Sequence, residues 1–134
     1  MPDSARPGRA ALLYLAVIFT LAFAFGAFRV SWLAPRIGDV AAVLIEVPLI
    51  LIASYVAARA IMPRFGIRNG VAALTMGALA FALLLMLECA LAVLAFGQSA
   101  TAWAAALATL PGMIGLLGQL GFALMPWAVM RRDT

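Results

Sequence analysis

The sequence contains no histidine, no lysine and one cysteine, Cys89, among its 134 residues. Zinc, haem and iron–sulfur centres are held mainly by histidines or by groups of cysteines, so these absences remove the usual ligands for metal and redox chemistry. A single thiol also cannot close an intramolecular disulfide. We therefore predict no metal site and no cofactor, and we interpret Cys89 as a small buried side chain.

Charged residues are also scarce, with nine arginines and five acidic residues giving a formal charge of +4 in a chain that is 67% hydrophobic. Such a chain cannot cover itself with a solvated surface as a soluble domain does. A nucleic-acid-binding protein would spread its basic residues over one exposed face, whereas here they lie mostly in short gaps between apolar runs. The composition predicts a membrane protein whose partner is the lipid bilayer, and it argues against nucleic acid as a partner.

Four apolar segments are long enough to cross a bilayer, which takes about 20 helical residues. We expect one all-α domain over residues 10–130, an integral membrane four-helix bundle with short loops and spans at 10–30, 40–62, 71–97 and 111–130. A disordered cytoplasmic lead (1–9) would precede it and a cytoplasmic tail (131–134) would follow it. A cleaved signal peptide is the alternative for the first segment, but its apolar run exceeds the usual 7 to 15 residues.

Prolines and glycines indicate where these spans are interrupted. We expect residues 31–39 to form a tight connection, because Pro35 and Gly38 disfavour a continued helix and Trp32 suits the headgroup level. Pro111 divides the long apolar stretch 102–130. This position favours a short interfacial helix anchored by Trp103 before the fourth span, with one long kinked helix as the alternative.

The arginines are unevenly divided between the two ends of such a bundle. Loops on the cytoplasmic side of membrane proteins carry the excess of basic residues. One end receives two, Arg29 and Arg36, and the other receives seven, Arg6, Arg9, Arg59, Arg64, Arg68, Arg131 and Arg132. We therefore expect both termini in the cytoplasm, and the small size and arginine-rich loops are typical of a bacterial inner (plasma) membrane protein.

Four polar side chains, one on each span, are expected in the outer half of the bilayer: Arg29, Glu46, Glu88 and Gln119. At ~1.5 Å of rise per residue, Arg29 lies near the outer interface and the other three lie roughly 9, 13 and 12 Å below it. The last three share a helix face with small residues, where membrane helices approach one another. The sequence therefore predicts an intramembrane polar cluster pointing into the bundle.

This cluster has two acids and one base. A charge near the centre of a membrane helix costs ~2.5 to 3.5 kcal/mol, so we expect at least one glutamate to pair with Arg29. The sequence leaves open whether the partner is Glu46 or Glu88. The other carboxyl would be protonated or solvated, and a proton fills the missing positive charge most readily.

Other features of the spans are compatible with helix packing alone. Pro48 frees the carbonyl of Leu44, which either bends the helix or reflects the ordinary frequency of proline in membrane helices. Glycines recur on the fourth span at spacings that permit close packing within the bundle or against another protomer, at Gly112, Gly115, Gly118 and Gly121. The remaining hydroxyl groups are interpreted as packing or interfacial groups, on Tyr14, Thr20, Ser54, Tyr55 and Thr75.

Two functional hypotheses follow from these residues. In the first, the polar cluster only fixes the packing of the helices, and the protein is an accessory, assembly or structural subunit of a membrane complex. In the second, it is a small proton- or cation-coupled transporter or channel that uses Glu46 or Glu88. Because four short spans would enclose little volume, we expect its path at the interface of a homo-oligomer. With no histidine and no activated nucleophile, we do not expect an enzyme and assign no catalytic residue.

Overall fold

The computed structural model describes residues 6–132, which are helical apart from short connections and contain no strand. The elements are α1 (Arg6–Phe28), the π-helical η1 (Arg29–Leu33), α2 (Ala34–Ile37), α3 (Asp39–Ile61), the 3-10 helix η2 (Met62–Phe65), α4 (Gly70–Leu94), α5 (Ala100–Ala106) and α6 (Leu110–Arg132). Residues 133 and 134 of the expected tail lie outside the described part, and Arg131 and Arg132 belong to α6.

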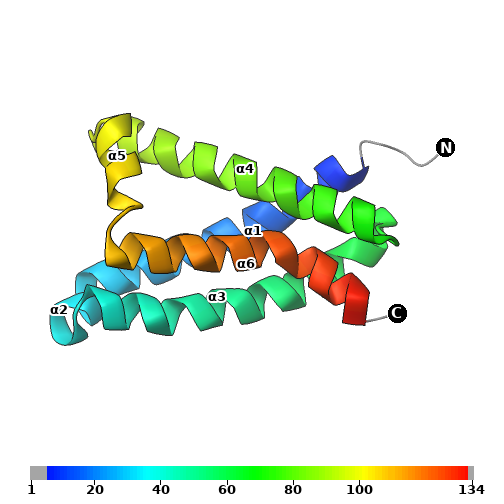
Figure 1. The fold of residues 1–134 in the computed structure, drawn as a ribbon, viewed down its shortest axis with the longest axis horizontal. Coiled ribbons are helices and arrows are strands. Elements are labelled where there is room, and N and C mark those ends of the chain that lie inside the picture. The colour runs from blue at the N-terminus through cyan, green and yellow to red at the C-terminus, as the bar shows by residue number, and fades with distance from the viewer. Residues whose placement is uncertain (1–5, 133–134) are drawn as a thin grey trace.

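The long helices form a bundle in which α3 and α4 each pack against both α1 and α6 (Figure 1). Four helical segments are long and apolar enough to cross a membrane: Arg6–Ile37, Asp39–Phe65, Gly70–Leu94 and Leu110–Arg132. The predicted all-α architecture with four such helices is therefore confirmed. We call the end at which α1 begins and α6 ends the basic end, and the end that carries α2 and α5 the α5 end.

The first helix begins earlier than the sequence suggested. Residues 6–9 are helical, so the expected disorder is wrong there, while residues 1–5 lie outside the described part. Proline is well tolerated in a first helical turn, which explains why Pro7 does not delay the start. The guanidinium of Arg6 lies against Gly66, where φ is +68° and an added Cβ would come within 2.9 Å of Arg6 Nη1.

The first helix also ends later than expected, because it continues through η1 and α2 as far as Ile37. The predicted connection over residues 31–39 is wrong, and Gly38, with φ +91°, is the break between the first two spans. The N–H of Ala34 donates to the carbonyl of Arg29, a wide turn typical of a π-helix. This widening comes directly before Pro35, which cannot donate to a preceding carbonyl, so the helix passes the proline without stopping.

The chain between the third and fourth spans forms a separate short helix. α4 ends at Leu94 and not near residue 97, and Gly97 adopts φ +67°. The Ser99 side chain then caps α5 by accepting a hydrogen bond from the N–H of Ala102 at 3.0 Å. Because α5 and α6 are distinct helices, the alternative of one long kinked helix is wrong.

The basic end of the bundle contains a tightly packed core. Tyr14 of α1 and Phe122 of α6 are almost completely buried, and their rings stack with centroids 4.4 Å apart. The Tyr14 hydroxyl donates to the Phe122 carbonyl at 2.6 Å. That carbonyl would ordinarily accept from the residue four positions later, which is Pro126 and has no N–H. Tyr14 therefore replaces the missing donor and ties α1 to α6 across the bundle.

Glycines allow α6 to approach its neighbours closely. A Cβ on Gly77 of α4 would overlap the carbonyl of Ala123, and one on Gly121 would lie 2.6 Å from Leu51 of α3. Gly118 lies against Val47, and Gly112 against the carbonyl of Ala106. Gly115 differs from the expectation of close packing, because no atom of another segment lies within 4 Å of the position its Cβ would take.

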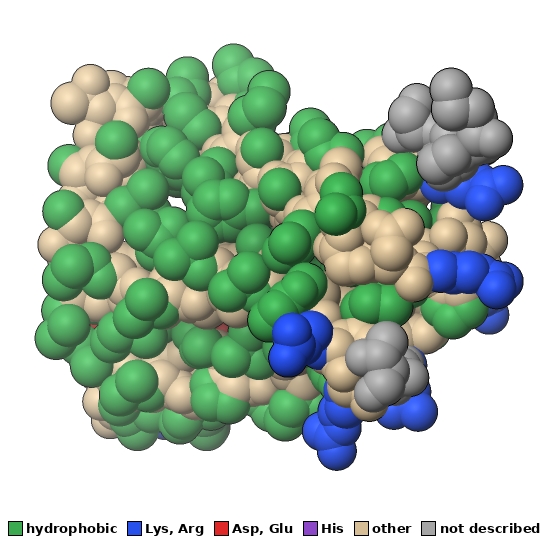
Figure 2. Space-filling model, turned by 45° about the vertical axis from the view of Figure 1, so that its right-hand side comes forward, with side chains coloured by type: hydrophobic (Ala, Val, Ile, Leu, Met, Phe, Trp, Pro, Cys, Tyr) green, Lys and Arg blue, Asp and Glu red, His purple; other side chains and the backbone are tan. Residues whose placement is uncertain are grey.

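Most of the arginine side chains lie at one end of the bundle. The first turns of α1, the last turn of α3, η2 and the last turn of α6 all meet at the basic end. Figure 2 shows blue arginine side chains gathered at that end, while hydrophobic side chains cover most of the remaining visible face.

Cys89 is only partly buried, so its interpretation as a buried core residue is wrong.

Candidate functional site

A cavity of about 910 Å³ lies between α1, α3, α4 and α6 in the half of the bundle near the α5 end. Three of its lining residues, Ile18, Leu84 and Phe122, also belong to the packed core, so the core forms its floor. The expectation that four short spans would enclose little volume is therefore wrong. The walls are mainly apolar and include five aromatic side chains, Phe19, Phe23, Phe96, Trp103 and Phe122.

Arg29 and Glu46 form an ion pair on one wall of this cavity. Arg29 Nε donates to Glu46 Oε2 at 2.5 Å, which joins η1 to α3. The side chains are 28% and 17% exposed, respectively. Gly26, one turn before Arg29, lies beside the guanidinium, and a Cβ there would make an ordinary contact with Arg29 Nη2 at 3.8 Å. The structure thus identifies the glutamate that pairs with the arginine.

Glu88 and Gln119 form a second pair, which joins α4 to α6. Gln119 Nε2 donates to Glu88 Oε1 at 2.6 Å. Within residues 6–132, this amide is the hydrogen-bond partner of the Glu88 carboxyl group. The other side-chain atom, Gln119 Oε1, is buried and has no hydrogen-bond partner among the described residues. The charge of Glu88 is therefore not balanced by a basic side chain in this part of the chain.

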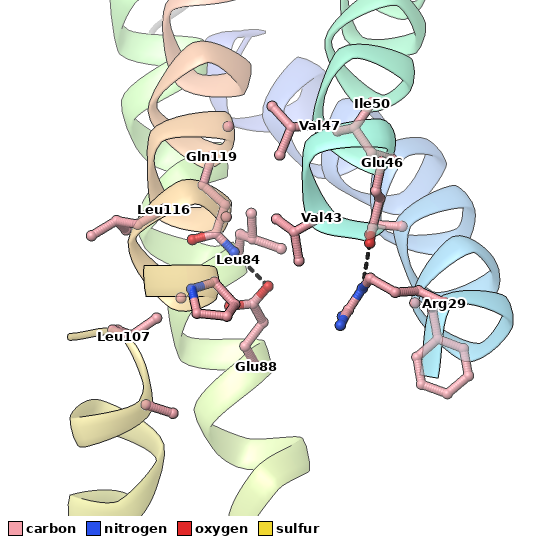
Figure 3. A pocket seen from close by; sticks show the side chains of 18 of the residues that line it. Arg29, Val43, Glu46, Val47, Ile50, Leu84, Glu88, Leu107, Leu116 and Gln119 are labelled. Atoms are coloured by element: carbon pink, nitrogen blue, oxygen red, sulfur yellow. Dashed lines mark hydrogen bonds and ion pairs between the residues drawn. The ribbon is translucent and has the colours of Figure 1, made fainter. Parts of the chain in front are cut away.

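All four predicted polar residues line the same cavity, but they do so as two pairs on different walls. Figure 3 shows Glu88 and Gln119 on the α4 and α6 side and Glu46 on α3, with the Arg29 side chain extending from η1 toward the space between the pairs. Within the described residues, no hydrogen bond connects one pair to the other. The open volume between the pairs is bordered by one carboxyl group in an ion pair, Glu46, and by one that is hydrogen-bonded to a neutral amide, Glu88.

Two side chains that line the cavity were not anticipated, and for a third, Tyr14, a packing or interfacial role was expected but its partner was not. Asp39 and Trp103 both line the cavity, although we expected them in a connecting loop and at the headgroup level. A signal for Asp39 was present, because it precedes Glu46 by two helical turns and shares its face with Val43 and Glu46. For Tyr14 the signal was Pro126, which leaves a carbonyl on α6 in need of a donor.

The carboxyl groups are spread around the cavity and do not converge on one point. In the range 6–132, no group of three or more acidic, histidine or cysteine side chains is placed to hold a metal ion. Three acids and one base line the walls, which gives a formal excess of negative charge. The site is therefore suited to a molecule that is largely apolar and carries positive charge or hydrogen-bond donors.

No protein-family model matches this chain, and no curated protein or solved structure matches it either. The comparisons therefore assign no activity to the cavity. The functional argument rests on the side chains that line it and on the helices that hold them.

Proposed function

We propose that this chain is a small proton- or cation-coupled transporter of a bacterial inner membrane, with both termini in the cytoplasm and the cavity open to the outside. The orientation is supported by the excess of arginine at the basic end, since cytoplasmic loops carry most basic residues. In this orientation the short helix α5 lies at the outer interface. The exposed Asp39 and Phe96 mark the part of the cavity that reaches the surface.

The observation that carries the proposal is a roomy cavity bordered by Glu88, a carboxyl group that has no basic partner in the part of the chain that the structure describes. Polar groups that only fix helix packing are normally surrounded by close-packed side chains and fully hydrogen-bonded. Here the volume of about 910 Å³ falls in the range of ligand sites, roughly 300–1,000 Å³. Ionisable residues inside membranes commonly mark ion or substrate paths.

The two glutamates take different roles in this proposal. Glu46 is committed to Arg29 and holds η1 against α3. Among residues 6–132 Glu88 accepts a hydrogen bond from the neutral amide of Gln119 and has no basic partner, so in this proposal it takes up and releases a proton. The packed core under the cavity, with Tyr14 hydrogen-bonded to Phe122, is the barrier on the cytoplasmic side. Transport requires this barrier to open while the outer end closes.

The test is proton movement in liposomes that contain purified protein, an internal pH indicator and a potassium diffusion potential, negative inside. Wild-type protein should acidify the interior faster than protein-free liposomes do. Glu88→Gln keeps the acceptor for Gln119 but removes the charge, and its rate should fall to the protein-free level. Arg36→Gln, which changes a residue outside the cavity, should keep the wild-type rate. Equal rates for wild type and Glu88→Gln would refute the proposed role of Glu88.

An accessory or assembly subunit of a larger complex is the second candidate, supported by the Arg29–Glu46 pair, which is satisfied within the chain. The two functions predict different partners. Mild solubilisation and pull-down should recover a stoichiometric larger protein if the chain is an accessory subunit. Recovery of the chain alone, or of a homo-oligomer, favours the transporter.

A further inference from the structure

We propose that the cavity binds a lipophilic organic cation, with Glu88 against its positive charge and the aromatic walls around its apolar body. The inference uses the site of the proposed function and names the class of molecule that the site takes. It can fail separately, because a site that exchanges only protons would move charge without binding such a molecule.

The positive charge of the expected ligand follows from how the ionisable side chains of the cavity are paired. Asp39, Glu46 and Glu88 line it together with one basic residue, Arg29, which is bonded to Glu46. A bound cation would place its charge beside Glu88. Within residues 6–132, the hydrogen-bond partner of this carboxyl group is the neutral amide of Gln119. A bound anion would have to approach three carboxyl groups while competing with Glu46 for Arg29. Charge complementarity therefore favours a cation.

The apolar character of the expected ligand follows from the aromatic side chains that line the cavity. Aromatic rings attract cations through their faces, and the effect is strongest for poorly hydrated organic cations such as quaternary ammonium groups. Phe19, Phe23 and Trp103 supply such rings around the cavity. A small hydrated metal ion would instead need several oxygen ligands at one point, and the carboxyl groups are not gathered in that way.

The space for the apolar body lies beside Gly115 on α6. An added Cβ there would meet no other segment within 4 Å, in contrast to Gly118, one turn further along α6, which lies against Val47. Gly115 and Gln119 are also one turn apart on the same helix, so the open space and the Glu88 contact belong to one face. Asp39 is exposed where the cavity reaches the surface, and its charge favours the approach of cations.

Two probe ions of the same shape and opposite charge test the inference directly: tetraphenylphosphonium and tetraphenylborate. Purified wild-type protein in detergent should bind the cation saturably in equilibrium dialysis and should not bind the anion saturably. Glu88→Gln should weaken cation binding by roughly tenfold or more, because the compensating charge is lost. The matched control Glu88→Asp keeps the charge and should retain most of the affinity. Saturable binding of the anion, or equal cation binding by wild type and Glu88→Gln, would overturn the inference.

A second measurement needs no substitution and applies even if Glu88→Gln does not fold. Dicyclohexylcarbodiimide modifies protonated carboxyl groups in apolar surroundings. The tryptic peptide covering residues 69–131 contains Glu88 as its sole acidic side chain, so an adduct on it reports on this residue. Tetraphenylphosphonium should slow this modification in wild-type protein, and tetraphenylborate should not. No protection by the cation contradicts the inference.

The results also separate this inference from the proposed function. Proton movement that depends on Glu88 without phosphonium binding would leave the transporter proposal intact and overturn the cation site. Phosphonium binding that depends on Glu88 without proton movement would support the cation site and overturn coupled transport.

Discussion

Glu46 and Glu88 are chemically identical side chains that have different hydrogen-bond partners. Glu46 meets a guanidinium and is one half of an ion pair, whereas Glu88 meets a carboxamide. Removing one member of a buried ion pair leaves the other charge uncompensated, which costs more than the pair itself contributes. At the scale of single residues, we therefore expect the Arg29–Glu46 and Glu88–Gln119 pairs to respond differently to substitution.

Arg29→Ala should lower the free energy of unfolding by about 1 kcal/mol or more, because Glu46 would remain charged without its partner. The pair is partly exposed, so we expect a value below that of a fully buried pair. Glu46→Gln in the same chain should recover part of the loss, and thermal unfolding in detergent measures both variants. Arg36→Ala, which removes an exposed arginine stacked on Trp32, is the control and should change little. Strictly additive effects of the two cavity substitutions would show that Arg29 and Glu46 do not interact.

At the scale of helices, the floor of the cavity depends on a proline on α6 and a tyrosine on α1. Tyr14→Phe would leave the Phe122 carbonyl buried without a donor, which costs about 1–3 kcal/mol. Pro126→Ala would restore a backbone N–H for that carbonyl. The two substitutions together should therefore cost less than the sum of their separate effects, measured as a double-mutant cycle by thermal unfolding. A cycle without coupling contradicts the role assigned to Tyr14.

Glycines on α4 and α6 give a matched pair for testing how the helices pack. Gly77→Ala forces a methyl group into the Ala123 carbonyl and should destabilise the bundle by about 1–3 kcal/mol. Gly115→Ala enters open space and should be neutral or stabilising by up to about 1 kcal/mol, since alanine is the better helix former. Similar losses of stability for both variants would show that α6 has a different rotation in the bundle.

At the scale of the whole molecule, apolar run length and arginine spacing were sufficient to predict four helices. The ends of those helices were harder to predict, because they depend on local devices such as the π-helical turn before Pro35 and the serine cap of α5. Depth along each span placed the four polar residues at one level, but depth carries no information about lateral distance. Which glutamate meets Arg29 depends on the order of helices around the bundle, and the sequence does not encode that order in a simple pattern.

The cavity itself could not be predicted, for a related physical reason. Gly115 and Gly118 have the same chemistry and spacing, yet Gly118 contacts Val47 and Gly115 borders open volume. The difference arises because the helices pack closely near the basic end and enclose the cavity near the α5 end. The proposed barrier depends on the packed half of the molecule, and the proposed binding site depends on the hollow half.

The most direct test of this account asks whether the hollow half is open to water from the outside. In a Cys89→Ala background, a cysteine is placed either at Gly115, which borders the cavity, or at Leu117, which is 68% exposed on the outer surface of the bundle and does not line the cavity. A membrane-impermeant cationic thiol reagent is then added to the outside of cells. We predict rapid modification of Gly115→Cys and little modification of Leu117→Cys. Protection of Gly115→Cys, or equal modification of the two cysteines, would contradict it.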